Sequence, residues 1–160
     1  MYRRILVPID GSPTSMQGLK EAIRLGADQR ARLHVLHVVD ELIVVQSLDA
    51  FAMSNAGDLI ESLREAGRKA LAEATALTRR HRVKADIRML DSHTLRVCDV
   101  IVDEAKKWRA DLIVMGTHGR RGMTRMLLGS DAEGVLRNTP VPVLLVRAVA
   151  QAGGRRARRR

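Results

Sequence analysis

Residues 111–138 read DLIVMGTHGRRGMTRMLLGSDAEGVLRN, and the rest of the chain can be placed around this stretch. It opens with a short apolar run, Leu112 to Met115, that breaks at Gly116. A loop rich in glycine and arginine follows, and a helix is predicted to begin at Gly129-Ser130. A strand, a glycine loop and a helix start direct backbone N–H groups and the positive end of a helix dipole towards an anion. The stretch therefore predicts a buried strand followed by an anion-binding loop.

The glycines have the spacing Gly116-x2-Gly119-x9-Gly129-Ser130. Glycine suits such a loop because it reaches positive φ and lets a phosphate approach the bare backbone. The Ser130 hydroxyl adds a group that can bond a phosphate oxygen or a metal ion. No lysine precedes Ser130, so this is not a Walker P-loop, and the first gap excludes the dinucleotide fingerprint. A loop that ends in a serine helix cap, without a ligand, remains the alternative.

The other elements follow from hydrophobic periodicity. Apolar runs predict strands over residues 3–9, 33–39 and 141–146, and alternation of apolar and polar residues predicts a strand near a sheet edge over 83–90. Helical spacing predicts helices over 13–27, 59–77 and 95–108. Alternating strands and helices predict an α/β fold, an open five-stranded parallel sheet with helices on both faces. Right-handed crossovers favour the strand order 3-2-1-4-5. Ligands bind such sheets at the carboxyl ends of the strands where the winding reverses, so Asp10 is predicted to face Gly116.

Length and composition limit the classes of protein to which the chain can belong. The chain has 160 residues, enough for one domain, and we expect residues 1–148 to form it and residues 149–160 to be a basic, disordered tail. No apolar run is long enough to span a membrane, no signal-peptide pattern precedes the first strand, and the single cysteine excludes an internal disulfide. We therefore expect a cytoplasmic protein. Phe, Trp and Tyr occur once each, which disfavours a protein that stacks single-stranded bases on aromatic rings.

Several residues have a structural interpretation beside a functional one. His34 and His37 are three apart on a strand, so they face opposite sides and cannot chelate one metal ion; His37 is expected to be a hydrogen-bonded core residue. Cys98 lies beside the apolar stripe of its helix and is expected to pack as a small apolar residue. The basic run at residues 79–82 suits the negative end of a helix dipole. Residues 40–57 are too apolar for a solvated loop and are expected to form a packed flap.

The chain resembles the universal stress protein family over nearly its whole length, to about Arg147. The resemblance rests on the segments RRILVPIDGS (3–12), LHVVD (36–40), ADLIVMGTHGRRG (110–122), LLGS (127–130) and VLRNTPVPVLLV (135–146). The glycine spacing is similar to that of the ATP-binding branch of the family. The resemblance implies a Rossmann-like fold of the HUP type and a bound ATP, with Mg²⁺.

The resemblance also implies roles for individual residues. Asp10 would hold the ribose hydroxyls or help to place a metal ion, with Pro8 in the same strand end. The Val38 backbone would meet the adenine edge, and Met115 with Gly116 would flank the sugar. The triphosphate would be surrounded by His118, Gly119, Arg120, Gly129, Ser130, Asp131 and Ala132.

Asp131 departs from the family pattern, in which many members have valine after Gly-Ser. A carboxylate suits the first turn of a helix, but it is unfavourable beside phosphates unless a metal ion intervenes. Arg120, Arg121 and Arg125 would compensate as phosphate partners. We therefore expect Asp131 to point to solvent or to one of these arginines, and its presence favours metal dependence.

Three functions are compatible with the sequence. The first is an ATP-binding regulatory protein of the stress response, which the resemblance implies to be a homodimer paired through the fifth strand, residues 141–147. The second is a slow Mg²⁺-dependent ATPase, although no nucleophile–base pair is suggested by the spacing. The third is an interaction module whose basic tail contacts nucleic acid, polyphosphate or an acidic protein; five arginines lie within residues 155–160. A solubilising tail is the alternative to the third.

Overall fold

The computed structural model of the chain describes residues 1–42, 44, 56–119 and 128–147. Its elements are, in chain order, β1 (Arg4–Pro8), α1 (Pro13–Gln29), β2 (Arg32–Asp40), α3 (Ala56–Arg80), β3 (Ala85–Ser92), α4 (Val97–Trp108), β4 (Leu112–Gly116), α5 (Ser130–Asn138) and β5 (Val143–Val146). The five strands form one parallel sheet in the order β3-β2-β1-β4-β5. The predicted fold class and strand order are confirmed.

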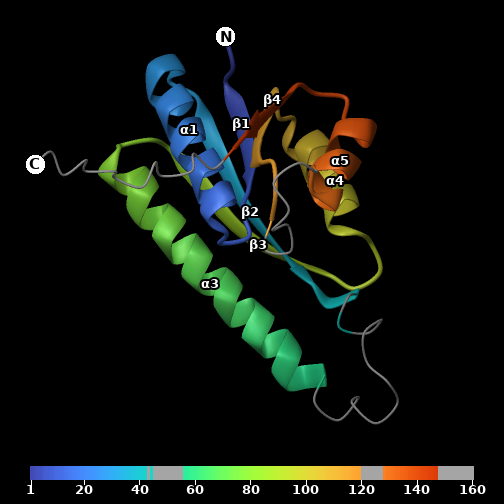
Figure 1. Ribbon diagram of the computed structural model, residues 1–160. Coiled ribbons are helices and arrows are strands. Elements are labelled where there is room, and N and C mark those ends of the chain that lie inside the picture. The colour runs from blue at the N-terminus through green and yellow to red at the C-terminus, as the bar shows by residue number, and fades with distance from the viewer. Residues whose placement is uncertain (43, 45–55, 120–127, 148–160) are drawn as a thin grey trace, which may run out of the picture.

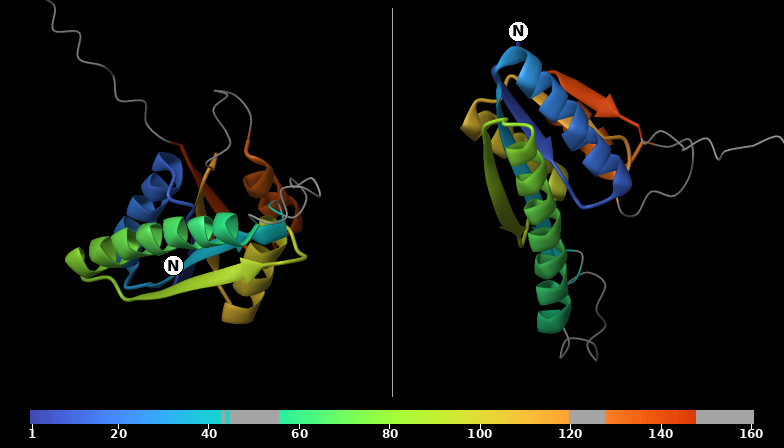
Figure 2. Two further views of the ribbon diagram at one scale, coloured as in Figure 1. Left: turned by 90° about the horizontal axis from the view of Figure 1, so that it is seen from below. Right: turned by 90° about the vertical axis from the view of Figure 1, so that its left-hand side faces the viewer.

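Two layers of helices cover the sheet, as Figures 1 and 2 show. Alternate residues of the central strands enter separate cores, because successive side chains of a strand point to opposite faces. Ile5 and Val7 pack with α1 and α3 in one core, whereas Leu6 packs with α4 and α5 in the other. Strands buried on both faces explain the continuous apolar runs of the sequence.

The helix α1 begins as its sequence predicts. Ser12 caps the helix, with its side-chain oxygen accepting the N–H of Ser15 at 3.2 Å, and Pro13 occupies the first turn. This start lies directly after β1, so it fixes the path of the chain at the carboxyl end of that strand. The end of β1 is therefore rigidly positioned.

The predicted element ends differ from the structure by a few residues. The predicted third strand began at Val83, but β3 begins at Ala85, because the Val83 N–H closes the end of α3 by donating to the Thr78 carbonyl at 3.0 Å. The strand then continues to Ser92 through polar residues, which an edge strand tolerates because one side is solvated. Similarly, α4 begins at Val97 rather than Leu95, since Arg96 is still extended.

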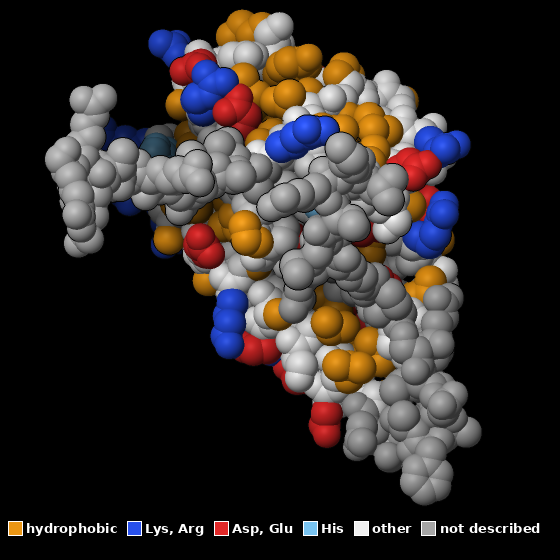
Figure 3. All heavy atoms as spheres, viewed as in Figure 1, with side chains coloured by type: hydrophobic (Ala, Val, Ile, Leu, Met, Phe, Trp, Pro, Cys, Tyr) orange, Lys and Arg blue, Asp and Glu red, His pale blue; other side chains and the backbone are white. Residues whose placement is uncertain are grey.

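The helix α3 is the longest described element, with 25 residues, and its N-terminal part projects beyond the sheet (Figures 1 and 2). Acidic and basic side chains lie next to one another along its exposed face (Figure 3). Arg68, for example, is within 2.5 Å of Glu61 and 2.8 Å of Glu65. The predicted flap at residues 40–57 falls mainly outside the described residues, as does the predicted tail, residues 149–160. No helix in the described part of the chain is both long and apolar enough to cross a membrane.

Candidate functional site

A cavity of about 280 Å³ opens at the carboxyl ends of the strands, where β1 lies between β2 and β4. This is the point at which the strand order reverses, the usual ligand site of open α/β sheets. The predicted site residues that line it are Pro8, Asp10, Val38, Met115, Gly116, His118, Gly119, Gly129, Ser130, Asp131 and Ala132. Arg120, Arg121 and Arg125 lie outside the described residues. The structure thus brings together every predicted site residue that it describes.

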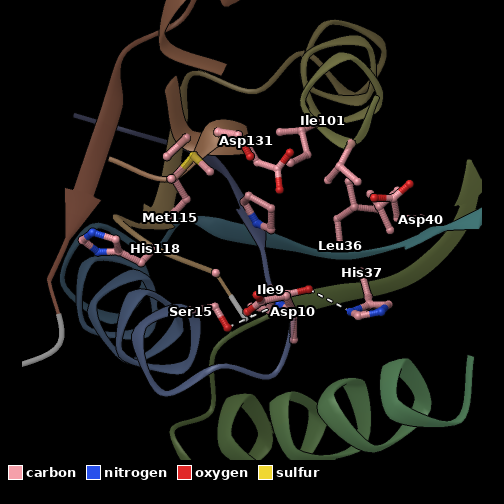
Figure 4. Close-up of a pocket in the computed structure, with 18 of the residues that line it drawn as sticks. Ile9, Asp10, Ser15, Leu36, His37, Asp40, Ile101, Met115, His118 and Asp131 are labelled. Atoms are coloured by element: carbon pink, nitrogen blue, oxygen red, sulfur yellow. Dashed lines mark hydrogen bonds between the residues drawn. The ribbon is translucent and has the colours of Figure 1, made fainter. Parts of the chain in front are cut away.

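Asp10 follows β1 and is held by the start of α1. Its Oδ1 accepts the Ser12 N–H at 3.0 Å, and its own N–H donates to the Ser15 Oγ at 3.3 Å. Ser15 is buried and donates its hydroxyl to the Ser12 carbonyl. A half-buried carboxylate is therefore fixed at the floor of the cavity, where Figure 4 shows it beside Ser15 and Ile9.

Gly119 lies directly against this carboxylate. A Cβ on Gly119 would come within 2.7 Å of the Asp10 Oδ2, which is closer than any ordinary contact. Gly116 is equally constrained, because its Cβ would meet backbone atoms of Thr14 and Ser15 at 2.9 Å and 3.0 Å. The glycines are needed for close approach, not for unusual backbone angles.

The expectation that the loop glycines use positive φ is wrong for those described. Gly129 has φ −64°, and among the described glycines only Gly11 has a positive φ, 81°. The absence of a side chain at Gly116 and Gly119 is therefore the property that the site uses. A bare backbone lets another group approach the peptide N–H directly.

The helix α5 begins at this cavity, as the sequence predicted. Gly129 begins the helix without a side-chain cap, and its N–H donates to the Thr117 carbonyl at 2.9 Å. The helical bonds start with the Glu133 N–H donating to Gly129. The N–H groups of the first turn, including those of Ser130 and Ala132, precede this bond and have no partner within the helix. Together with the helix dipole they favour an anion.

His118 adds a polar atom to the same end. Its Nδ1 lies 2.9 Å from the Thr117 Oγ1, while its Nε2 is buried and has no hydrogen-bond partner within the described residues. An unpaired buried nitrogen is costly, and a ligand oxygen would relieve that cost. His118 is therefore suited to contact an occupant of the cavity.

The opposite end of the cavity is mostly apolar. Leu36 of β2 and Ile101 of α4 lie on this side in Figure 4, and Val38, Leu63 and Val97 also line the cavity. In Figure 4 His118 lies at one end of the cavity, and Leu36 and Asp40 lie at the other. Of these apolar residues, only Val38 was predicted from the sequence. The i, i+4 spacing of Val97 and Ile101 marks one face of a helix, but nothing local shows that this face reaches a cavity.

Asp131 lines the cavity and is exposed at the same time, so its expected turn to solvent does not take it away from the site. It lies in the first turn of α5 and is seen at the cavity between Met115 and Ile101 in Figure 4. Its place in the first turn explains this position, because that turn faces the cavity. The negative charge of Asp131 also contributes to raising the pKa of Arg96, after the larger effect of Asp99. A second carboxylate thus faces the space that Asp10 borders.

His34, His37 and the cysteine have structural roles. The His37 Nδ1 lies 2.9 Å from the Ile9 carbonyl, which confirms a satisfied core histidine. His34 lies on the other face, within 3.0 Å of Glu104 and stacked on Trp108. Cys98 is 3% exposed, and burial raises the pKa of its thiol, so it packs as an inert residue. Within the described ranges no cluster of three or more His, Cys, Asp or Glu side chains forms a metal site.

Comparison with known proteins gives a consistent result. The chain matches the universal stress protein family over residues 1–147. It is 36% identical over 148 residues to universal stress protein MJ0531 of Methanocaldococcus jannaschii, covering 92% of this chain and 83% of that protein. Universal stress protein A homolog 1 of Coxiella burnetii is 34% identical over 147 residues, covering 91% of this chain and 96% of that protein.

Solved structures agree. A universal stress family protein from Burkholderia pseudomallei superposes with a TM-score of 0.73 at 34% identity, covering 90% of this chain and 95% of that one. The protein MJ0577 superposes with a TM-score of 0.78 at 25% identity, covering 94% and 99%. Two further structures share the fold at 23% identity: a universal stress protein in complex with cAMP, TM-score 0.65, and one from Archaeoglobus fulgidus in complex with dAMP, TM-score 0.62. The chain therefore belongs to the universal stress protein family.

Proposed function

We propose that this protein binds an adenine nucleotide, ATP with Mg²⁺, in the cavity between β1 and β4, and that it acts as a regulatory homodimer in the stress response. The observation that carries the proposal is the contact between Asp10 and the bare backbone of Gly119, where a Cβ would lie only 2.7 Å from the Asp10 Oδ2. The Asp10 carboxylate and the bare backbone of Gly119 meet in one cavity that has an apolar end and an amide-lined end.

The chemistry of the cavity fits the three parts of a nucleotide. The apolar end, with Leu36, Val38 and Ile101, suits a flat base. The Asp10 carboxylate accepts hydrogen bonds and suits the ribose hydroxyls. The first turn of α5 suits phosphate, because its N–H groups and its dipole favour an anion.

Relatives in the family support an adenine nucleotide as the ligand. Two of the solved proteins with this fold are in complex with cAMP and with dAMP, both of which are adenine nucleotides. The predicted site residues, with Arg120 among them, would surround base, sugar and phosphates as the family resemblance implies.

A magnesium ion would be held mainly by phosphate oxygens. Mg²⁺ keeps several waters and takes one or two carboxylates beside substrate phosphates, and Asp10 and Asp131 both line the cavity. When bound, the ion supplies positive charge between the phosphates and these carboxylates. That charge would offset the repulsion that Asp131 exerts on a triphosphate.

A bound nucleotide would affect the interaction with other molecules through the dimer interface. β5 is an edge strand of the described sheet and pairs only with β4. The same β4 ends at Gly116, a lining residue of the cavity. A nucleotide at this end of β4 and a partner on β5 would therefore act on neighbouring strands.

Two measurements test the ligand. The ultraviolet absorbance ratio of the purified protein reports co-purifying nucleotide with high sensitivity, because the chain has one Trp and one Tyr. Calorimetric titration then compares ATP, AMP and GTP, with and without Mg²⁺. We expect ATP to bind and GTP to bind more weakly.

The variant Gly119→Ala gives the sharpest structural test. Its Cβ would displace the Asp10 carboxylate, so we expect ATP affinity to fall at least about tenfold, which corresponds to about 1.4 kcal/mol. Gly57→Ala is the matched control, because nothing lies within 4 Å of a Cβ at Gly57. The proposal is wrong if no adenine nucleotide binds, or if both variants bind ATP as the unchanged protein does.

A further inference from the structure

Three arginines end three different helices in the left-handed conformation. Arg30 after α1 has φ 55°, Arg82 after α3 has φ 55° and Arg109 after α4 has φ 54°. They are the only residues other than glycine with positive φ in the described part of the chain. Glycine, or sometimes asparagine, is the usual residue here, because a Cβ makes this conformation unfavourable by about 1 kcal/mol.

The three helix ends have the same local structure. The residue after each arginine is Ala31, Val83 or Ala110. In each case its N–H donates to the carbonyl five residues earlier, at 3.0, 3.0 and 2.8 Å, which closes the helix. A glycine would serve this turn better in all three places. The backbone therefore gives no reason for arginine.

These helix ends lie at one edge of the molecule. The strands are parallel, so their first residues share the edge opposite the cavity, near the N-terminus in Figure 1. Backbone bonds at 2.9 Å join Lys84 to Leu33 and Arg3 to Arg32, so the cations before β3 and β1 are neighbours of the start of β2. We call the surface formed by Arg3, Arg30, Arg32, Arg82, Lys84 and Arg109 the basic edge.

Few acidic groups neutralise the basic edge. Asp86 is 2.8 Å from Arg32, and Asp111 accepts the backbone N–H groups of Arg3 and Arg4. Within the described residues Arg30, Arg82 and Arg109 have no ion pair. Helix dipoles explain some cations at helix ends, but α3 and α4 already carry basic residues in their last turns. Arg82 and Arg109 thus add charge beyond what their helices require, whereas α1 has no basic residue in its last turn, so Arg30 also complements the dipole of that helix.

We propose that the basic edge binds the phosphate backbone of duplex nucleic acid. The strand starts from β3 to β4 span three strand spacings, about 14 Å, a length of duplex that carries about eight phosphate charges. Arginine is suited to phosphate because its planar fork makes two parallel hydrogen bonds. The helix ends fix the backbone of the three arginines, so binding to regularly spaced phosphates orders little more than their side chains.

Other polyanions fit the basic edge less well. Single strands bind through aromatic platforms, but the Trp108 ring is half-buried, stacked on His34 and covered by the Arg4 guanidinium at 4.5 Å. A membrane surface is favoured by apolar anchors beside the cations. Ala31 and Ala110, between the cations of the edge, are buried, and Met1, two residues before Arg3, is an exposed large apolar side chain. A single such side chain is a weak membrane anchor.

The test is a titration of a labelled mixed-sequence duplex of about 20 base pairs at several salt concentrations from about 50 to 200 mM. Every protein is the full chain with the five arginines among residues 155–160 changed to glutamine, so that the tail does not contribute. The edge variant is Arg30→Gly/Arg82→Gly/Arg109→Gly. The control, Lys20→Gln/Arg68→Gln/Lys69→Gln, removes the same charge from the middle of α1 and α3.

We expect the edge variant to bind about a hundredfold more weakly at the middle of this salt range, with the slope of log K against log salt reduced by about two to three. The control should keep the slope. The edge variant should melt at the same temperature or higher, because glycine fits the left-handed turn. Arg→Lys at the same three positions should retain much of the slope and lose affinity.

Several outcomes would overturn the proposal. One is the absence of duplex binding at the lowest salt concentration, and another is equal weakening in the edge variant and the control. A third outcome is tested by titrating vesicles of phosphatidylserine and phosphatidylcholine in parallel. If the edge variant loses vesicle binding while duplex binding is unchanged, the surface binds lipid instead. A lower melting temperature in the edge variant would show that the arginines are structural.

Discussion

The Gly67 backbone in α3 lies against the His37 ring of β2: a Cβ on Gly67 would be 2.5 Å from the His37 Cδ2 and 2.8 Å from its Nε2. The ring cannot retreat easily, because its Nδ1 is held 2.9 Å from the Ile9 carbonyl. Ile9 and His37 both line the cavity. The contact thus joins the packing of α3 to the floor of the candidate site.

We therefore expect Gly67→Ala to destabilise the protein. Alanine gains about 1 kcal/mol of helix propensity, but the clash costs about 1–3 kcal/mol, and because the His37 ring is held we expect the upper half of that cost, a net loss of up to about 2 kcal/mol. Urea unfolding measures it. Gly57→Ala, in the same helix with open space around it, should be neutral or stabilising. Equal stability of the two variants would mean that the His37 ring moves aside without cost.

The second prediction concerns the charge at the phosphate end. Asp131→Asn removes a carboxylate that lines the cavity. We expect it to increase ATP affinity about tenfold without Mg²⁺, because the repulsion between this carboxylate and the phosphates is lost. The size assumes an effective dielectric constant between those of protein and water. AMP affinity should rise less, because AMP carries less charge. Calorimetry with both nucleotides measures the difference.

Added Mg²⁺ should remove most of the gain, since the ion neutralises phosphate charge. Asp28→Asn, at the far end of α1, makes the same chemical change away from the cavity and should leave both affinities unaltered. An unchanged ATP to AMP ratio in Asp131→Asn would show that this carboxylate does not act on the phosphates.

The sequence was sufficient for the parts of the structure that depend on local pattern. Continuous apolar runs identified four of the strands and alternating residues identified β3, and right-handed crossovers then led to the order β3-β2-β1-β4-β5. Because that order places the ends of β1 and β4 side by side, the proximity of Asp10 to the Gly116 loop followed from topology alone. The ends of elements were less predictable. Val83, for example, is an apolar residue that would suit a strand, but it lies in the turn that closes α3.

Relationships between distant segments could not be predicted. The contact of Gly67 with His37 depends on where two elements cross, and a glycine inside a helix gives no sign of its neighbour. The same holds for Leu63 and Ile101, apolar helix residues that line the cavity, although Ile101 also packs in the α4 and α5 core. The left-handed conformation of Arg82 could not be predicted either, because a residue with a Cβ rarely adopts positive φ.

The third prediction is a pH dependence of stability from His34. Burial lowers the pKa of His34, and the Glu104 carboxylate, which acts in the opposite direction, offsets only part of this effect. The folded protein therefore holds His34 neutral at a pH where the unfolded chain, with an ordinary pKa of about 6.5, takes up a proton. The contribution is complete above about pH 6.5 and is lost as the pH falls towards the lowered folded pKa.

Denaturant unfolding between about pH 8 and pH 5 should show this loss, about 1.4 kcal/mol for each unit by which the pKa is lowered. His34→Gln should remove that part of the slope, although it also costs the stacking on Trp108. His81→Gln, at an exposed position, is the control and should leave the slope unchanged. An identical slope in all three proteins would show that His34 does not titrate differently on folding.

The last prediction concerns the edge of β5. Residues 142, 144 and 146 direct their backbone groups to β4, since the carbonyls of Pro142 and Val146 accept N–H groups from Ile113 and Thr117 at 2.9 Å. Backbone groups alternate along a strand, so the N–H of Leu145 points away from the sheet. In the proposed homodimer this N–H is available to a second copy of the strand.

Leu145→Pro removes that donor and leaves the bonds to β4 intact, whereas Leu145→Ala loses the same packing against the α4 and α5 core but keeps the N–H. Sedimentation should therefore find Leu145→Ala at twice the chain mass of 17.7 kDa and Leu145→Pro at the single mass. If both variants keep the same assembly, the subunits do not pair through this strand. If both variants dissociate, side-chain packing holds the subunits together. Both variants lose the leucine side chain, and only the proline variant also loses the backbone N–H.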